Sequence, residues 1–169
     1  MNEVKIFMAE MDTKRRDTEI NAYGIDLGTT NSSIAVATWK PGGKPECRVL
    51  EVAQPLWPIG SMTSPLVPSV VALMGNGYPV IGEGAKRLRA TPQEDNLFPE
   101  RNLFYETKND IGLRKTYYRA PEAFDHSSKI AGHILKFLKN VALQNGNKKS
   151  VPLNVTVPAS FQLNQCRDT

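Results

Sequence analysis

The segment from Ala22 to Ser33 constrains the fold of this chain more than any other part of it. It reads Ala-Tyr-Gly-Ile-Asp-Leu-Gly-Thr-Thr-Asn-Ser-Ser, so an apolar run ends at Asp26 and five small polar residues follow Gly28. Apolar residues resume at Ile34. The pattern predicts two strands that flank a tight turn with a carboxylate at its mouth. A hairpin whose Asp and Thr side chains satisfy their own backbone would explain it, and so would a site for a phosphate and a metal ion.

A phosphate site on this turn would differ from the two common glycine-rich loops. In the Walker and Rossmann loops the glycines precede a helix, whose N-terminus meets the anion, whereas a strand follows the turn here. In a strand–turn–strand clamp, Gly28 would let the backbone approach the phosphate closely because it has no Cβ. Successive backbone N–H groups would form a concavity for the anion, and the hydroxyls of Thr29 and Thr30 would add donors. Asp26 could hold a magnesium ion through its waters.

Composition excludes several classes of protein. The chain has 169 residues and 40% hydrophobic content, which suits one ordinary domain or part of a larger one. Its net charge of +4 is not concentrated in a dense basic cluster, so we expect no nucleic-acid partner. No apolar run approaches the ~18 residues of a membrane span, and we expect no membrane partner. Cys47 and Cys166 stand far apart, which favours a reducing cytoplasm over a disulfide framework.

Periodicity divides the rest of the chain into short elements. Residues 1–19 form a polar N-terminal extension. We expect strands over 20–27, 33–39, 47–53, 67–74, 78–81 and 153–157. The first three would form an antiparallel meander, and the proline-containing stretch 54–66 would be a loop. Helices are expected over 82–90, from Ser128 to the Asn145-Gly146 stop, and from Phe161 onward.

The chain resembles a known family at several of these elements. Its turn resembles the first phosphate motif of the sugar-kinase, heat-shock and actin superfamily. More narrowly, "YGIDLGTTNSSIAV" is similar to the start of the nucleotide-binding domain of the seventy-kilodalton heat-shock chaperones. Further similar stretches are "VPSVVAL", "GNGYPVIGEGAKRLRA", "PQEDNLFPERNLFYETKNDIG" and "LNVTVPASF". Together they cover residues 20–169 in order.

The resemblance implies an α/β fold, namely a ribonuclease-H-like lobe as in actin-like ATPases. Its core would be a mixed five-stranded sheet with flanking helices and a small inserted α/β subdomain over roughly 76–120. Residues 20–169 would then be the first lobe of the ATPase domain, truncated before the second lobe. That second lobe would carry another glycine-rich phosphate loop and the adenosine site.

The resemblance also implies roles for single residues. Gly28, Thr29, Thr30 and Asn31 would grip the phosphates of ATP or ADP, and Asp26 would position Mg²⁺. Lys108 stands four residues before Gly112, the place of the family's catalytic lysine.

Three departures place the chain among divergent, bacterial-type relatives. Leu66 and Val67 stand where the family often has two threonines before Pro68-Ser69, and Cys166 replaces an arginine. This arginine and the proline at the position of Pro158 relay the nucleotide state in family members, so the relay is in doubt here.

The implied function is that of an ATP-hydrolysing molecular chaperone in the cytoplasm, with ATPase activity in the complete protein and an inactive first lobe on its own. Its partners would be the nucleotide, the second lobe, unfolded client proteins and co-chaperones. Three alternatives stay open: a sugar-kinase-like enzyme, an actin-like filament ATPase, and a degenerate nucleotide-binding module.

Overall fold

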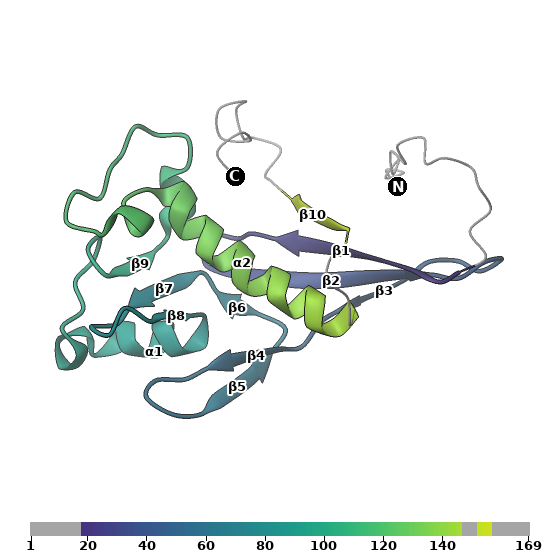
Figure 1. Cartoon of the computed structure of the whole chain (residues 1–169), viewed down its shortest axis with the longest axis horizontal. Coiled ribbons are helices and arrows are strands. Elements are labelled where there is room, and N and C mark those ends of the chain that lie inside the picture. Colours follow the sequence, from purple (N-terminus) through teal and green to yellow (C-terminus); the bar gives the residue numbers. More distant parts are fainter. Residues whose placement is uncertain (1–17, 147–151, 157–169) are drawn as a thin grey trace.

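The structure is a computed structural model that describes residues 18–146 and 152–156 (Figure 1). Nearly all of the predicted extension over 1–19, Pro158, Cys166 and the helix predicted from Phe161 lie outside the described residues.

The main sheet has five strands, as expected from the sequence. Its order is β10 (Leu153–Thr156), β1 (Ile20–Asp26), β2 (Asn31–Trp39) and β3 (Glu46–Val49), and the short β6 (Val67–Pro68) pairs with the start of β2. β1 runs antiparallel to β2 and parallel to β10, so the sheet is mixed. Tyr23 and Ile25 of β1 are buried while their neighbours are more exposed, the two-residue period of a strand with one face in the core.

The expected third strand over 47–53 is wrong, because two strands occupy this stretch. The backbone N–H of Leu50 makes its hydrogen bond to Ile34 O, 2.8 Å away, just after β3 ends. β4 (Val52–Pro55) then leaves the main sheet and pairs with β5 (Ser61–Ser64) in a separate two-stranded sheet. The loop expected over 54–66 is therefore wrong in part. Its three prolines stand at the end of β4, in the turn and after β5, where no ladder N–H is needed.

The expected strand over 67–74 is also divided, at Ser69. β6 stays with the main sheet, whereas β7 (Val70–Leu73) pairs with β8 (Pro79–Ile81) and β9 (Leu103–Tyr105) in a three-stranded sheet. The Asn76-Gly77 turn joins β7 to β8 as predicted, and Gly77 supplies the positive φ of 81° that such a turn requires. Helix α1 (Glu83–Ala90) packs on this sheet through Ala85 and Leu88.

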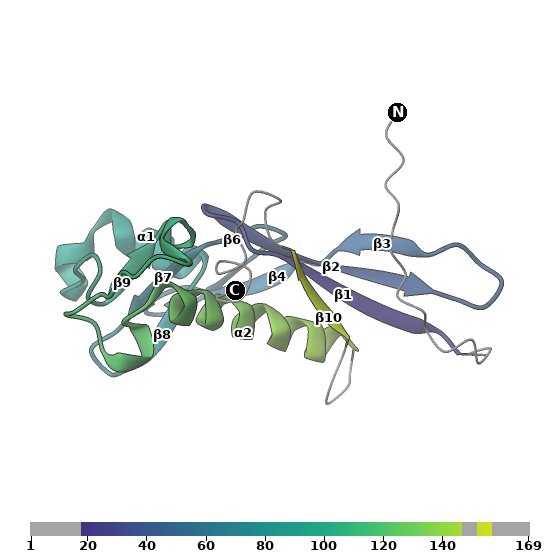
Figure 2. The same ribbon diagram turned by 90° about the horizontal axis from the view of Figure 1, so that it is seen from above.

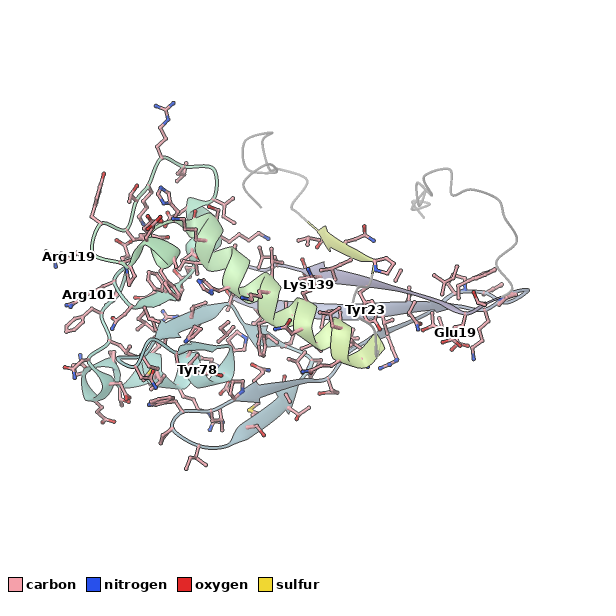
Figure 3. All side chains as sticks on the ribbon, viewed as in Figure 1. Glu19, Tyr23, Tyr78, Arg101, Arg119 and Lys139 are labelled. Atoms are coloured by element: carbon pink, nitrogen blue, oxygen red, sulfur yellow. The ribbon has the colours of Figure 1, made fainter. Side chains whose placement is uncertain are left out.

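Helix α2 (Ser127–Gly146) confirms the helix predicted from Ser128 and covers one face of the main sheet (Figures 1 and 2). Its buried residues recur every three or four positions. They are Ser127, Ile130, Ala131, Ile134, Leu138 and Ala142. The hydroxyl of Tyr23 reaches from β1 to Asn145 Oδ1 at the end of α2, 3.3 Å away (Figure 3). A second apolar cluster lies between α1 and the three-stranded sheet.

In the part of the chain that the structure describes, three 3₁₀ helices connect the remaining elements: η1 (Pro92–Asp95), η2 (Thr107–Asp110) and η3 (Glu122–Phe124). Within the described ranges, no helix is long and apolar enough to cross a membrane.

Candidate phosphate site

The turn between β1 and β2 spans only four residues, Leu27 to Thr30. Leu27 is buried and anchors it, whereas Gly28, Thr29 and Thr30 are partly or fully exposed. The backbone closes so tightly that a Cβ on Gly28 would lie 1.9 Å from the carbonyl oxygen of Asn31. No real Cβ approaches an oxygen this closely, so this turn geometry requires glycine at position 28.

Ser69 stabilises the turn through two hydrogen bonds to its carbonyl oxygens. Its hydroxyl donates to Gly28 O at 2.7 Å, and its backbone N–H donates to Thr30 O at 2.8 Å. The buried hydroxyl of Ser32 lies 2.9 Å from the Ser69 hydroxyl. Because C=O and N–H of a trans peptide point in opposite directions, the N–H groups of Thr29 and Asn31 point away from Ser69. The turn thus offers its donors on one side, as an anion-binding concavity requires.

Asp26 ends β1 at the entrance to this turn and is exposed. Its Oδ1 accepts a hydrogen bond of 2.9 Å from the hydroxyl of Thr156, its neighbour on β10. Among the described residues, no cluster of three or more His, Cys, Asp or Glu side chains could hold a metal ion. A single carboxylate suits Mg²⁺, which keeps most of its waters and takes further oxygens from phosphates. The residues present therefore fit a nucleotide-bound magnesium ion better than a metal held by the protein alone.

Lys108 reaches the turn from a distant part of the chain. It lies in η2, and its ammonium group donates a hydrogen bond to Leu27 O. Leu27, Gly28, Ser69 and Lys108 line one small cavity beneath the turn. The structure thus brings Asp26, the Gly-Thr-Thr turn and Lys108 together, although β1 and η2 are separated by some eighty residues of chain.

A groove of about 150 Å³ opens beside the turn and was not predicted from the sequence. Thr29, Thr30 and Asn31 form one wall, and side chains from α1 and β9 form the other. Its charged side chains are Lys86, Arg89 and Glu106. The guanidinium of Arg89 lies 3.9 Å from Glu106 Oε1 and 3.7 Å from the centre of the Tyr105 ring. Two cations against one carboxylate leave the groove beside the turn with a net positive charge.

Sequence reasoning missed the residues that support the site. Ser32, Ser69 and Thr156 are small polar residues in strands, and their role depends on which strands pair. Ser69 and Thr156 both stand in stretches that resemble the family, the Pro-Ser stretch and "LNVTVPASF", but neither was assigned a role there.

The mixed sheet, the helix across it and the turn between its first two strands define the class of this protein. It is an α/β protein with a ribonuclease-H-like lobe of the actin-like ATPase kind.

No protein-family model matches the chain. It is similar to "Heat shock protein SSC3, mitochondrial" from Saccharomyces cerevisiae, with 31% identity over 176 aligned positions that cover 95% of this chain. The chain spans 25% of that relative's length. This homology supports a place in the seventy-kilodalton heat-shock family.

Proposed function

We propose that this chain is the first lobe of an ATP-binding and ATP-hydrolysing chaperone of the heat-shock family, divergent and of bacterial type. The observation that carries the proposal is the hydrogen bond from Lys108 to Leu27 O, because it joins the predicted catalytic lysine to the predicted phosphate turn. The groove beside the turn, in which Lys86 and Arg89 outnumber Glu106, supports an anionic ligand near the turn.

The proposed roles follow from the geometry of the turn. The N–H groups of Thr29 and Asn31, with the Thr29 and Thr30 hydroxyls, bind the β- and γ-phosphates. Asp26 orients the waters of Mg²⁺, and Thr156 fixes the carboxylate through its hydrogen bond. Bound magnesium supplies charge neutralisation on the phosphates. Lys108 neutralises charge that develops on the transferring phosphoryl group and orients the attacking water.

The partners are proposed from the family. The complete protein would bind a nucleotide between this lobe and a second one, and would act on unfolded client proteins with co-chaperones. We propose the cytoplasm as its location and neither nucleic acid nor membrane as a partner. A degenerate module that binds but does not hydrolyse ATP is the alternative that the departures at Leu66, Val67 and Cys166 keep open. The sugar-kinase-like and filament alternatives have no specific support in the structure.

The proposal is tested by Lys108→Ala in the parent protein, meaning the complete polypeptide that contains this chain. ATP turnover should fall on the order of a hundredfold, because a group that stabilises transition-state charge is lost. The dissociation constant for ATP should stay within about threefold, since the turn remains intact. Single-turnover hydrolysis and calorimetry measure the two quantities.

Lys139→Ala is the matched control, because Lys139 is an exposed lysine on α2 (Figure 3). It should change neither quantity. Unchanged turnover in Lys108→Ala would remove the catalytic assignment. ATP binding without measurable turnover in the unmodified parent protein would favour the degenerate module.

A further inference from the structure

The 3₁₀ helix that carries Lys108 is so short that contacts from outside it must fix its position. η2 is a single 3₁₀ turn of four residues, Thr107 to Asp110, and such turns have poorer hydrogen-bond geometry than an α-helix. Glu106 precedes it in the left-handed region, with a φ of 57°. The Lys108 ammonium reaches Leu27 O only if something outside η2 fixes this turn. Buried Ile111 supplies one anchor at its C-terminal end.

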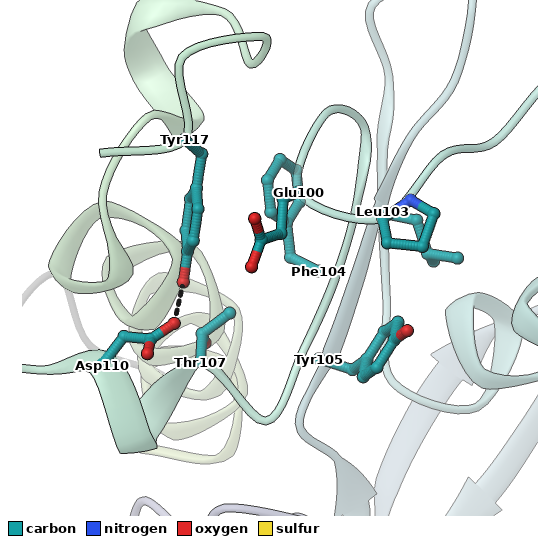
Figure 4. Close-up of a pocket in the computed structure, with 8 residues that line it drawn as sticks. Glu100, Leu103, Phe104, Tyr105, Thr107, Asp110 and Tyr117 are labelled. Carbon is teal, nitrogen blue, oxygen red and sulfur yellow. Dashed lines mark hydrogen bonds between the residues drawn. The ribbon is translucent and has the colours of Figure 1, made fainter. Parts of the chain in front are cut away.

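A second anchor is polar and lies at Asp110. Its Oδ2 accepts hydrogen bonds from the Tyr117 hydroxyl at 2.9 Å and from the Lys115 ammonium at 2.8 Å. Lys115 also lies 2.7 Å from Oε1 of Glu100. Figure 4 shows the phenol pointing straight at the Asp110 carboxylate, with Thr107 beside it and Glu100 across the small cavity.

The two donors to Asp110 differ in how firmly they are held. The Lys115 side chain is 40% exposed, and an ion pair open to solvent contributes little. Tyr117 is only 3% exposed. Burial, with help from the hydrogen bond to Asp110, raises the pKa of the Tyr117 hydroxyl. The phenol therefore stays protonated and remains a donor across the physiological range.

Tyr117 is in turn fixed to the rest of the lobe. Its backbone N–H donates to Asp125 O at 2.7 Å, two residues before α2 begins. Its ring lies 5.7 Å from that of Phe104 on β9, which stacks on Phe124 at 5.8 Å. Phe124 stacks on His133 of α2 at 4.2 Å. Contacts thus run without a gap from the long helix α2 to Asp110 at the end of η2.

We propose that Tyr117 and Asp110 are positioning residues for Lys108: their hydrogen bond holds η2 so that the lysine ammonium stays at the phosphate turn. This inference rests on the proposed function. Tyr117 lies outside the stretches that resemble the family. Asp110 lies within one of them but had no role assigned there.

Tyr117→Phe in the parent protein tests the inference, because it removes one hydroxyl and keeps the ring. The single-turnover rate constant for ATP hydrolysis should fall roughly tenfold or more, since a displacement of about 1 Å can cost on the order of a hundredfold. The dissociation constant for ATP should stay within about threefold. Tyr118→Phe is the matched control, because Tyr118 is the next residue and is 92% exposed. It should leave the rate unchanged.

A double-mutant cycle separates positioning from general loss of structure. If Tyr117 acts through Lys108, adding Tyr117→Phe to Lys108→Ala should slow hydrolysis no further. A second tenfold loss in the double variant would overturn the inference, and so would an unchanged rate in Tyr117→Phe alone. An unchanged rate in Lys108→Ala would instead overturn the proposed function itself, so the two failures are distinguishable.

Asp110 provides a test that does not depend on how well Tyr117→Phe folds. Asp110→Ala removes the acceptor, whereas Asp110→Asn keeps an amide oxygen that can accept the bond from Tyr117. The rate of Asp110→Asn should exceed that of Asp110→Ala several-fold. Equal rates in the two variants would contradict positioning through this hydrogen bond.

Discussion

At the scale of single residues, two glycines of the same segment differ in whether the structure has space for a Cβ. Gly24 and Gly28 lie four residues apart, the first within β1 and the second just after it. A Cβ on Gly24 would meet no atom within 4 Å, whereas one on Gly28 would collide with the backbone of Asn31. Since a backbone oxygen cannot move aside as a side chain can, only Gly28 is needed for the shape of the turn.

We therefore expect Gly28→Ala to destabilise the protein by about 1–3 kcal/mol, the usual cost of overpacking. The turn must open to admit the methyl group, so ATP binding should weaken as well. Gly24→Ala is the matched control and should have little effect on either. The midpoint of thermal unfolding and calorimetric titration with ATP measure the two effects. Equal behaviour of the two variants would show that the tight turn does not occur in solution.

At the scale of elements, one buried glutamine joins the β4–β5 hairpin to α1. Gln54 is fully buried in β4. Its Nε2 donates to Leu66 O at 3.0 Å, and its Oε1 accepts the backbone N–H of Glu83 at 2.9 Å. The first N–H groups of a helix have no partner within the helix, and the N-cap residue Gly82 offers no side chain to α1. The side chain of Gln54, from β4, therefore caps the N-terminus of α1.

Gln54→Ala should lower the free energy of unfolding by about 2–4 kcal/mol, because it leaves two backbone groups unpaired and opens a cavity. Gln93→Ala replaces an exposed glutamine of η1 and serves as the control. Thermal unfolding of both variants tests the expectation. Hydrogen exchange should also quicken at the Glu83 amide in Gln54→Ala alone, and an unchanged exchange rate there would exclude the capping role.

At the scale of the whole molecule, two apolar cores share the three-stranded sheet. The first lies between α2 and the main sheet and extends over one face of the three-stranded sheet, at Val71, Ile81 and Phe104. The second lies between α1 and the other face of that sheet. The chain crosses from the first sheet to the second at Ser69, the residue that braces the turn. Lys108 follows β9 in the chain, and its ammonium group reaches the turn at Leu27 O. The site therefore depends on how both sheets are joined.

The proposed site is also half of a clamp, since the second glycine-rich loop is expected in another lobe. We expect the 169-residue chain alone to bind ATP at least tenfold more weakly than the parent protein, a difference of at least about 1.4 kcal/mol. Calorimetry on the two proteins in one magnesium-containing buffer measures the ratio. Comparable affinities would mean that this lobe holds the nucleotide without a partner.

The sequence by itself determined what local patterns encode. The apolar, β-branched segments on either side of the turn predicted β1 and β2, and Asn76-Gly77 predicted the β7–β8 hairpin. The spacing from Ser128 predicted α2 to within one residue. The Gly-Thr-Thr turn and the resemblance pointed to the residues of the site. These signals lie within a few residues of one another, where backbone sterics and a two- or 3.6-residue period govern the outcome.

Only the tertiary structure decided where continuous apolar runs break and what meets across the fold. Residues 47–53 and 67–74 each look like one strand, because β-propensity does not tell which sheet a strand will join. The division at Ser69 arises because β6 completes the main sheet while β7 is buried between β8 and β9. The contacts of Ser69 with Gly28 and of Tyr117 with Asp110 follow from that packing. Long-range contacts of this kind depend on the arrangement of both cores, which no local pattern in the chain encodes.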